Sequence, residues 1–190
     1  MRSLTGPIAQ ARLHGGLVNP WVIAGLKRDE VRNSATLAGL WNREFGGSAS
    51  TRFLAAYLGS AIPSVDWHGE LLHHYRVETE INPLGCSADR VDLIIETCSH
   101  LIGIEIKIDA GLGFEQLERY RTSVGKRAKL MGLTGHVIFL SGFHSEEPNI
   151  YNSSWRDVER AAFQATASQK GSQTFVETLI RHFGRHVRTF

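Results

Sequence analysis

Residues 101–108 read LIGIEIKI, and no other short stretch of the chain is as informative about its fold. Four isoleucines alternate with Leu101, Gly103, Glu105 and Lys107. Successive side chains of a strand point to opposite faces, so the isoleucines share one face while Glu105 and Lys107 share the other. Burying such charges is costly unless they pair with each other or bind a metal. The stretch therefore predicts a buried strand that carries a functional acid and base.

The composition is that of an ordinary globular protein. The chain has 190 residues, 42% of them hydrophobic and 21% charged, so we expect one domain with a substantial core. A net charge of +2 neither demands nor excludes nucleic acid as a partner. We expect no membrane association, because no apolar stretch approaches the length of a span. The first residues lack the apolar core of a secretory signal, so we expect a cytoplasmic protein with reduced cysteines.

The hydrophobic pattern predicts the order of the elements. Glycine and proline pairs indicate an irregular arm over residues 1–25, ahead of a single domain over residues 26–190. The domain starts with a helix, which has Asp29 and Glu30 in its first turn, and a second helix follows the break at Gly46-Gly47. Three strands, a helix, a fourth strand and two more helices are predicted over residues 71–81, 90–96, 101–108, 114–131, 136–142, 155–169 and 174–188.

This order predicts an α/β fold. The link over residues 97–100 is short enough for an antiparallel hairpin between the second and third strands. The helix between the third and fourth strands predicts that those two strands are parallel. We expect a mixed four-stranded sheet in the order α-β-β-β-α-β, flanked by helices, with a polar loop over residues 142–154.

Asp92 is a further charged residue in a predicted strand, where it interrupts an apolar run. The predicted hairpin brings it near Glu105 and Lys107, and two carboxylates beside a lysine suit Mg²⁺ or Mn²⁺. Glu-x-Lys alone is a weak signal of catalysis and is more typical of a solvated strand face. Gln116 and Tyr120 add weight to the functional reading, since residues four apart share one face of a helix.

Taken together, these motifs resemble the signature of the PD-(D/E)XK nuclease superfamily. The resemblance rests on Asp92, on Glu105-Ile106-Lys107 and on the Gln-x-x-x-Tyr element that starts at Gln116. An uncharacterised family of that superfamily has similar I-E-x-K-I and Q-L-x-x-Y motifs. Its N-terminal pattern also resembles the segments 30–40 and 47–58 of this chain. Two departures are Val91 before Asp92, where the namesake proline is absent, and Asn33, where a histidine is expected.

The resemblance implies a restriction-endonuclease-like core and a role for each motif residue. Asp92, Glu105 and the backbone carbonyl of Ile106 would be the metal ligands. Lys107 would activate water and stabilise phosphate, and Glu30 would complete the site. Gln116 would position Lys107 or substrate, and Tyr120 would contact the substrate backbone or brace the site. Two acids of the first strand rival Glu30 for its role, and they are Glu78 and Glu80.

Basic residues supply candidate contacts to phosphate. Arg119, Arg121 and Lys126 are predicted on the helix that carries Gln116, although a solvated basic face is the alternative. The sequence thus favours a magnesium- or manganese-dependent nuclease that cleaves phosphodiester bonds, with DNA as the favoured substrate. The alternative is a nucleic-acid-binding or interaction module that does not cleave, such as a subunit of a defence or repair complex. The pattern does not determine whether the substrate is DNA or RNA, or whether cleavage is endo- or exonucleolytic. It also does not determine whether the chain forms a homodimer.

Overall fold

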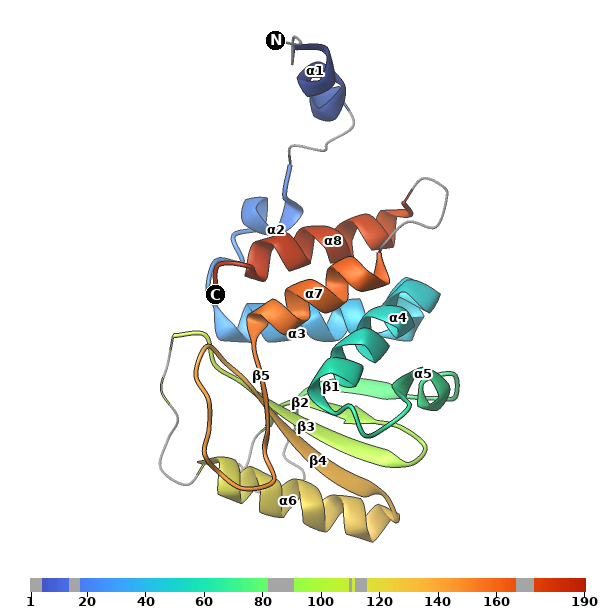
Figure 1. Cartoon of the computed structure of the whole chain (residues 1–190), viewed down its shortest axis with the longest axis vertical. Coiled ribbons are helices and arrows are strands. Elements are labelled where there is room, and N and C mark those ends of the chain that lie inside the picture. The colour runs from blue at the N-terminus through green and yellow to red at the C-terminus, as the bar shows by residue number, and fades with distance from the viewer. Residues whose placement is uncertain (1–4, 14–17, 82–90, 110, 112–115, 167–172) are drawn as a thin grey trace.

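The computed structural model describes residues 5–13, 18–81, 91–109, 111, 116–166 and 173–190. Figure 1 shows the elements in chain order. The helices are α1 (Thr5–Leu13), α2 (Pro20–Ile23), α3 (Glu30–Trp41), α4 (Arg43–Ala61), α5 (Trp67–Glu70), α6 (Gln116–Met131), α7 (Trp155–Ala165) and α8 (Phe175–Val187). The strands are β1 (Arg76–Ile81), β2 (Val91–Glu96), β3 (His100–Ile106), β4 (Thr134–Leu140) and β5 (Tyr151–Ser153).

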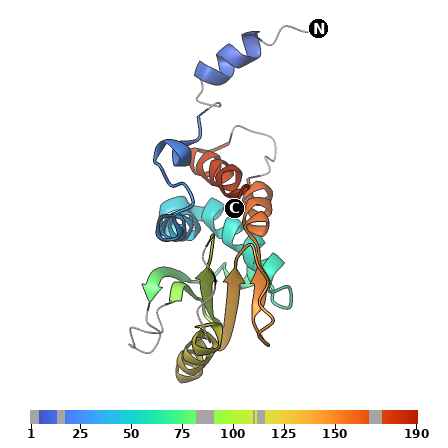
Figure 2. The same cartoon turned by 90° about the vertical axis from the view of Figure 1, so that its left-hand side faces the viewer.

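One mixed sheet, in the order β1-β2-β3-β4-β5, forms the centre of the molecule. β1, β2 and β3 are antiparallel neighbours, whereas β3, β4 and β5 run parallel. The predicted β2–β3 hairpin and the parallel β3–β4 pair are therefore confirmed. Figures 1 and 2 show α6 on one side of the sheet and α3, α4, α7 and α8 on the other.

The alternation of LIGIEIKI separates two hydrophobic cores. Ile102, Ile104 and Ile106 belong to the larger core, under α3, α4, α7 and α8. Leu101 belongs to the smaller core, under α6. Gly103 lies on the α6 side, where an added Cβ would meet Val124 at 2.8 Å, so the lack of a side chain lets helix and sheet approach closely. The strand is thus buried on both faces, as the sequence predicts.

The strand prediction needs two corrections. A fifth strand, β5, lies inside the segment 142–154 that was predicted to be a loop. It is only three residues long, and its pairing with β4 is a tertiary event that leaves no periodic pattern in the sequence. The first strand begins at Arg76 rather than at residue 71, because Leu71 to His73 continue the turn that ends α5 through bonds to Trp67, Gly69 and Glu70.

The N-terminal arm was predicted to be irregular, and this is wrong for its described part, which contains α1 and α2. The side chain of Asn19 caps α2 by accepting a hydrogen bond from the backbone of Trp21. Trp21 also donates its indole N–H to the carbonyl of Leu179 at 3.0 Å and meets Phe183 edge-on. α2 therefore packs against α8, and the packed domain begins before residue 26.

The break predicted at Gly46-Gly47 is present as a kink. α4 runs on both sides of Gly47, whose φ of 57° favours glycine.

In the part of the chain that the structure describes, no helix has the length and hydropathy needed to span a bilayer.

Candidate active site

The β2–β3 hairpin brings Asp92 and Glu105 together. Leu93 pairs with Ile104, and the same antiparallel register continued by one residue places Asp92 opposite Glu105. Side chains directly opposite each other on one face of a sheet have Cβ atoms about 5 Å apart. Lys107 directly follows the last residue of β3, and its backbone N–H donates to the carbonyl of Leu140 at 2.9 Å. The three motif residues therefore converge at one end of the central strands.

Glu105 is the most deeply buried of these groups, at 1% exposure. Its Oε1 atom lies 2.8 Å from Nζ of Lys107 and accepts a hydrogen bond of 2.8 Å from Nε2 of Gln116. Its Oε2 atom is buried and has no hydrogen-bond partner among the described residues. Burial and then the charge of Asp92 raise the pKa of Glu105 to about 7, against the opposing effect of Lys107.

Asp92 is held by the backbone of the neighbouring strand. Its Oδ2 atom accepts a hydrogen bond of 2.8 Å from the N–H of Ile106, so its carboxylate lies beside the Ile106 main chain. Burial raises the pKa of Asp92, although this N–H and the charge of Lys107 act in the opposite direction. The charge of Asp92 thus disfavours ionisation of Glu105, whereas a hydrogen bond from Glu105 lowers the pKa of Asp92. A bound cation would relieve the repulsion that arises when both groups are ionised.

Lys107 is a mostly buried ammonium among acids, with 14% of its side chain exposed. Burial alone would lower its pKa, but the hydrogen bond to Glu105 and the charges of Glu105, Asp92 and Glu30 raise it. Lys107 is therefore protonated at neutral pH. In this state it can donate hydrogen bonds to water or phosphate, and it cannot accept a proton.

Glu30 reaches the site from α3, where it is the first helical residue after the N-cap Asp29. Its Oε1 atom accepts a hydrogen bond of 2.9 Å from the backbone N–H of Ile108, and its Oε2 atom lies 3.8 Å from Nζ of Lys107. Glu78 is exposed on β1, and the side chain of Glu80 lies outside the described part of the structure. Glu30 is thus the helix-borne acid that the fold brings to Lys107.

Gln116 and Tyr120 line the site from α6, as their spacing predicts. The amide of Gln116 bridges Glu105 and the hydroxyl of Tyr120, which it meets at 2.7 Å. Tyr120 is buried, and burial raises its pKa, so its hydroxyl stays protonated. This chain of bonds holds the Oε1 side of Glu105 in place and leaves Oε2 for another ligand.

The arrangement suits a hard divalent cation. The buried carboxyl group of Glu105 and the half-buried one of Asp92 lie together, and one buried oxygen of Glu105 lacks a partner among the residues described. Oxygen ligands of this kind are preferred by Mg²⁺ and Mn²⁺. The described residues contain no cluster of three or more His, Cys, Asp or Glu side chains that could hold a metal. An ion here would therefore need main-chain or water oxygens besides Asp92 and Glu105.

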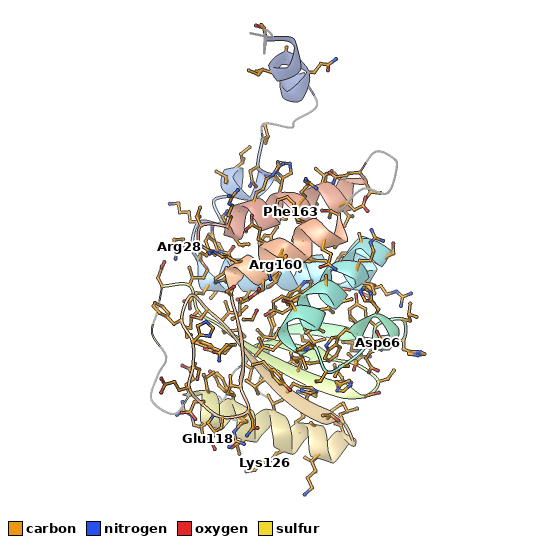
Figure 3. All side chains as sticks on the ribbon, viewed as in Figure 1. Arg28, Asp66, Glu118, Lys126, Arg160 and Phe163 are labelled. Carbon is orange, nitrogen blue, oxygen red and sulfur yellow. The ribbon has the colours of Figure 1, made fainter. Side chains whose placement is uncertain are left out.

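The predicted phosphate contacts lie further out. Arg121 makes a bidentate pair with Glu118, with distances of 2.6 to 3.0 Å, and Arg119 is exposed. Lys126 is exposed ten residues after Gln116, about 15 Å along the helix axis at the usual rise. Figure 3 shows the spread of Glu118 and Lys126 along α6. The structure gathers neither Arg121 nor Lys126 around the carboxylates.

Two contacts near Lys107 are not indicated by any motif of the sequence. The indole N–H of Trp155 donates to the carbonyl of Lys107 at 3.3 Å. Arg28 binds the carboxylate of Asp109, two residues after Lys107. The only signal in the sequence was the acid at the end of IEIKID, which is too common to identify a partner.

A mixed α/β sheet with paired carboxyl groups and a lysine at the end of its central strands is the arrangement of a restriction-endonuclease-like fold. A family model of the PD-(D/E)XK nuclease superfamily matches residues 18–187, and the chain belongs to that superfamily. Membership supports a nuclease-type function. No curated protein and no solved structure matches the chain.

Proposed function

We propose that the protein is a metal-dependent nuclease that hydrolyses phosphodiester bonds, with DNA as its favoured substrate. The observation that carries this proposal is the buried Oε2 atom of Glu105, which lies beside Asp92 and has no hydrogen-bond donor among the described residues, while the Lys107 ammonium lies on Oε1. Glu105 is the one carboxylate among the described residues that has a buried oxygen without a hydrogen-bond donor, and the neighbouring charge of Asp92 makes that oxygen favourable for a cation.

Asp92, Glu105 and the backbone carbonyl of Ile106 would hold Mg²⁺ or Mn²⁺ in this proposal. The ion would offset the repulsion between the carboxylates and stabilise charge that develops on phosphate. Lys107 donates hydrogen bonds to the attacking water and to a phosphate oxygen, and Glu30 keeps the ammonium in place from 3.8 Å. Gln116 and Tyr120 hold Glu105 in the orientation that presents its second oxygen.

Nucleic acid is the partner that this function requires. Arg119, Arg121 and Lys126 would contact its backbone outside the reacting phosphate, without reading sequence. Arg121 would have to release Glu118 first, since its guanidinium is engaged in the free protein. Assembly into a homodimer or a larger defence or repair complex, and a cytoplasmic location, stay predictions from the sequence.

The test is a cleavage panel on the full chain. Supercoiled plasmid, linear duplex, single-stranded DNA and RNA are incubated with Mg²⁺, with Mn²⁺ or with chelator. We expect metal-dependent cleavage of DNA that falls roughly 100-fold or more in Asp92→Ala and in Lys107→Ala. Glu146→Gln, a change to an exposed acid on the loop after β4, should cleave like the wild type.

Equal cleavage by the two site variants would show that the activity belongs to another site or to a contaminant. Metal-independent binding of nucleic acid without cleavage under any condition would instead favour the non-cleaving module. Cleavage restricted to RNA would retain the proposed chemistry and reject DNA as substrate.

A further inference from the structure

Arg28 connects the helix that carries Glu30 to the segment that carries Lys107. It lies in the loop between α2 and α3, two residues before Glu30. Its Nε and Nη2 atoms donate to the two carboxylate oxygens of Asp109, with shortest distances of 2.8 and 2.6 Å. Such bidentate pairs fix the relative orientation of both groups. Figure 3 shows Arg28 at the edge of the molecule, away from Arg160 on α7.

The same guanidinium also holds the end of the chain that follows α8. Its Nη1 atom donates to the carbonyl of Thr189 at 2.7 Å, and its centre lies 5.0 Å from the centroid of the Phe190 ring. Its Nη2 atom approaches the carbonyl of Ile108 at 3.5 Å. Arg28 thus joins three segments that are distant in the sequence.

Trp155 closes the arrangement from α7. It is 1% exposed, and its indole N–H donates to the carbonyl of Lys107 at 3.3 Å. Its ring meets Phe190 edge-on, with the centroids 5.2 Å apart. Phe190 therefore contacts both Arg28 and Trp155, and we call Arg28, Asp109, Trp155 and Phe190 the clamp.

Lys107 needs such support because β3 ends one residue before it. Its backbone keeps one bond to the sheet, from its N–H to Leu140, and its carbonyl depends on Trp155. The next N–H, that of Ile108, is bonded to Glu30. The positions of the Lys107 ammonium and the Glu30 carboxylate therefore depend on how these few residues past the strand are held.

Stability alone does not account for the clamp. Arg28 and Asp109 have side chains 40% and 65% exposed, and exposed ion pairs contribute little to folding. The mutual hydrogen bonds raise the pKa of Arg28 and lower that of Asp109, so both stay charged at working pH. The pair instead fixes geometry, since it ties the loop that leads into α3 to residues 108 and 109.

We propose that the clamp positions Lys107 and Glu30 for catalysis, with Arg28 and Asp109 as its positioning residues. Neither residue contacts the paired carboxyl groups of Asp92 and Glu105. The inference rests on the proposed nuclease function for its kinetic consequence, and on the fold alone for its structural one.

Two variants and a matched control test the clamp. Arg28→Met removes the charge and the fork of donors, and Asp109→Asn removes only the charge of the acceptor. Arg160→Met is the control, because Arg160 is an exposed arginine on α7 that pairs with Asp157 at 3.3 Å. Arg28→Lys serves as the mild variant, which keeps a cation but loses the bidentate geometry.

The first readout is amide hydrogen exchange and needs no activity. We expect exchange of the Ile108 N–H to be at least tenfold faster in Arg28→Met and Asp109→Asn, while Ile104 in the middle of β3 exchanges as in the wild type. The second readout is kinetic. We expect kcat to fall about tenfold with KM within twofold, because the clamp acts on groups used in the transition state. Arg28→Lys should fall between, and Arg160→Met should change neither readout.

Wild-type exchange at Ile108 together with wild-type kcat in Arg28→Met would overturn the inference. Faster exchange throughout β3 in both Arg28 variants would also overturn it, since the role would then be general stability. If the wild type cleaves no substrate, the proposed function fails, and exchange at Ile108 alone still decides whether the clamp holds Glu30 in place.

Discussion

Nζ of Lys107 lies 2.8 Å from Oε1 of Glu105, whereas Oε2 of the same carboxylate is buried without a hydrogen-bond partner among the described residues. The Lys107 ammonium thus neutralises the Oε1 side of the Glu105 carboxylate, and no described cation lies on the Oε2 side. Asp92 lies close enough that its charge raises the pKa of Glu105 further. Binding of a cation between the two carboxyl groups would therefore be favourable.

Glu105→Gln should make the metal-free protein more stable at pH 8. The pKa of about 7 means that the wild type holds a buried charge beside Asp92 at this pH, and the amide removes that charge while keeping an oxygen for Lys107. We expect a gain of about 1–3 kcal/mol at pH 8 that shrinks as the pH falls below 7 and is lost below 4.5, the ordinary pKa of the group. Urea unfolding with chelator measures it, and lower stability of the variant at pH 8 would contradict the assignment of the repulsion.

Metal affinity should depend on pH through Glu105. Its folded pKa is raised from 4.5 to about 7, so the folded metal-free protein binds an extra proton in that window and loses stability as the pH rises through it. A divalent ion competes with this proton. Apparent affinity for Mn²⁺ should therefore rise up to about tenfold per unit between pH 5.5 and 7 and then level off. Titration calorimetry measures it, and a constant affinity over this range would exclude Glu105 as a ligand.

Glu30→Gln should lower cleavage about tenfold or more, because it removes the charge that lies 3.8 Å from Lys107. The amide oxygen can still accept from the N–H of Ile108, so amide exchange there should stay slow. Glu78→Gln and Glu80→Gln provide the comparison and should cleave within twofold of the wild type. A larger loss in either of these than in Glu30→Gln would move the role of third acid to β1.

Gly103→Ala should destabilise the fold by about 1–3 kcal/mol, because its Cβ would meet Val124 at 2.8 Å where α6 packs on β3. Gly59→Ala is the matched control. Gly59 lies in α4, and an added Cβ there has open space, so we expect a gain of about 0.5–1 kcal/mol. Urea unfolding of both variants measures the difference. Equal free energies of unfolding would show that α6 can shift away from β3 without a loss of stability.

The local parts of the site were readable from the sequence. Strand alternation put Glu105 and Lys107 on one face, and a link of four residues predicted the hairpin that brings Asp92 opposite Glu105. Helical spacing put Gln116 and Tyr120 on one side of α6. Each of these inferences spans fewer than about 20 residues, a range over which backbone geometry repeats regularly.

Other features could not be predicted because they depend on contacts between distant segments. β5 has too few residues to show alternation, and it exists because the edge of β4 offers it hydrogen bonds. α2 is one helical turn whose Trp21 finds its partners on α8. The clamp joins Arg28, Asp109 and Phe190 across more than 150 residues of sequence.

The sequence by itself determined the central strand, its hairpin and the chemistry of the carboxylates and lysine, because side-chain alternation is a property of the extended backbone. Tertiary structure decided which further acid joins Glu105 beside Lys107. Glu30 is 78 residues from the Ile108 N–H that it accepts from, and only the packing of α3 against the sheet brings them together. It also decided that one oxygen of Glu105 has no hydrogen-bond donor among the residues that the structure describes, since that depends on every neighbour in three dimensions.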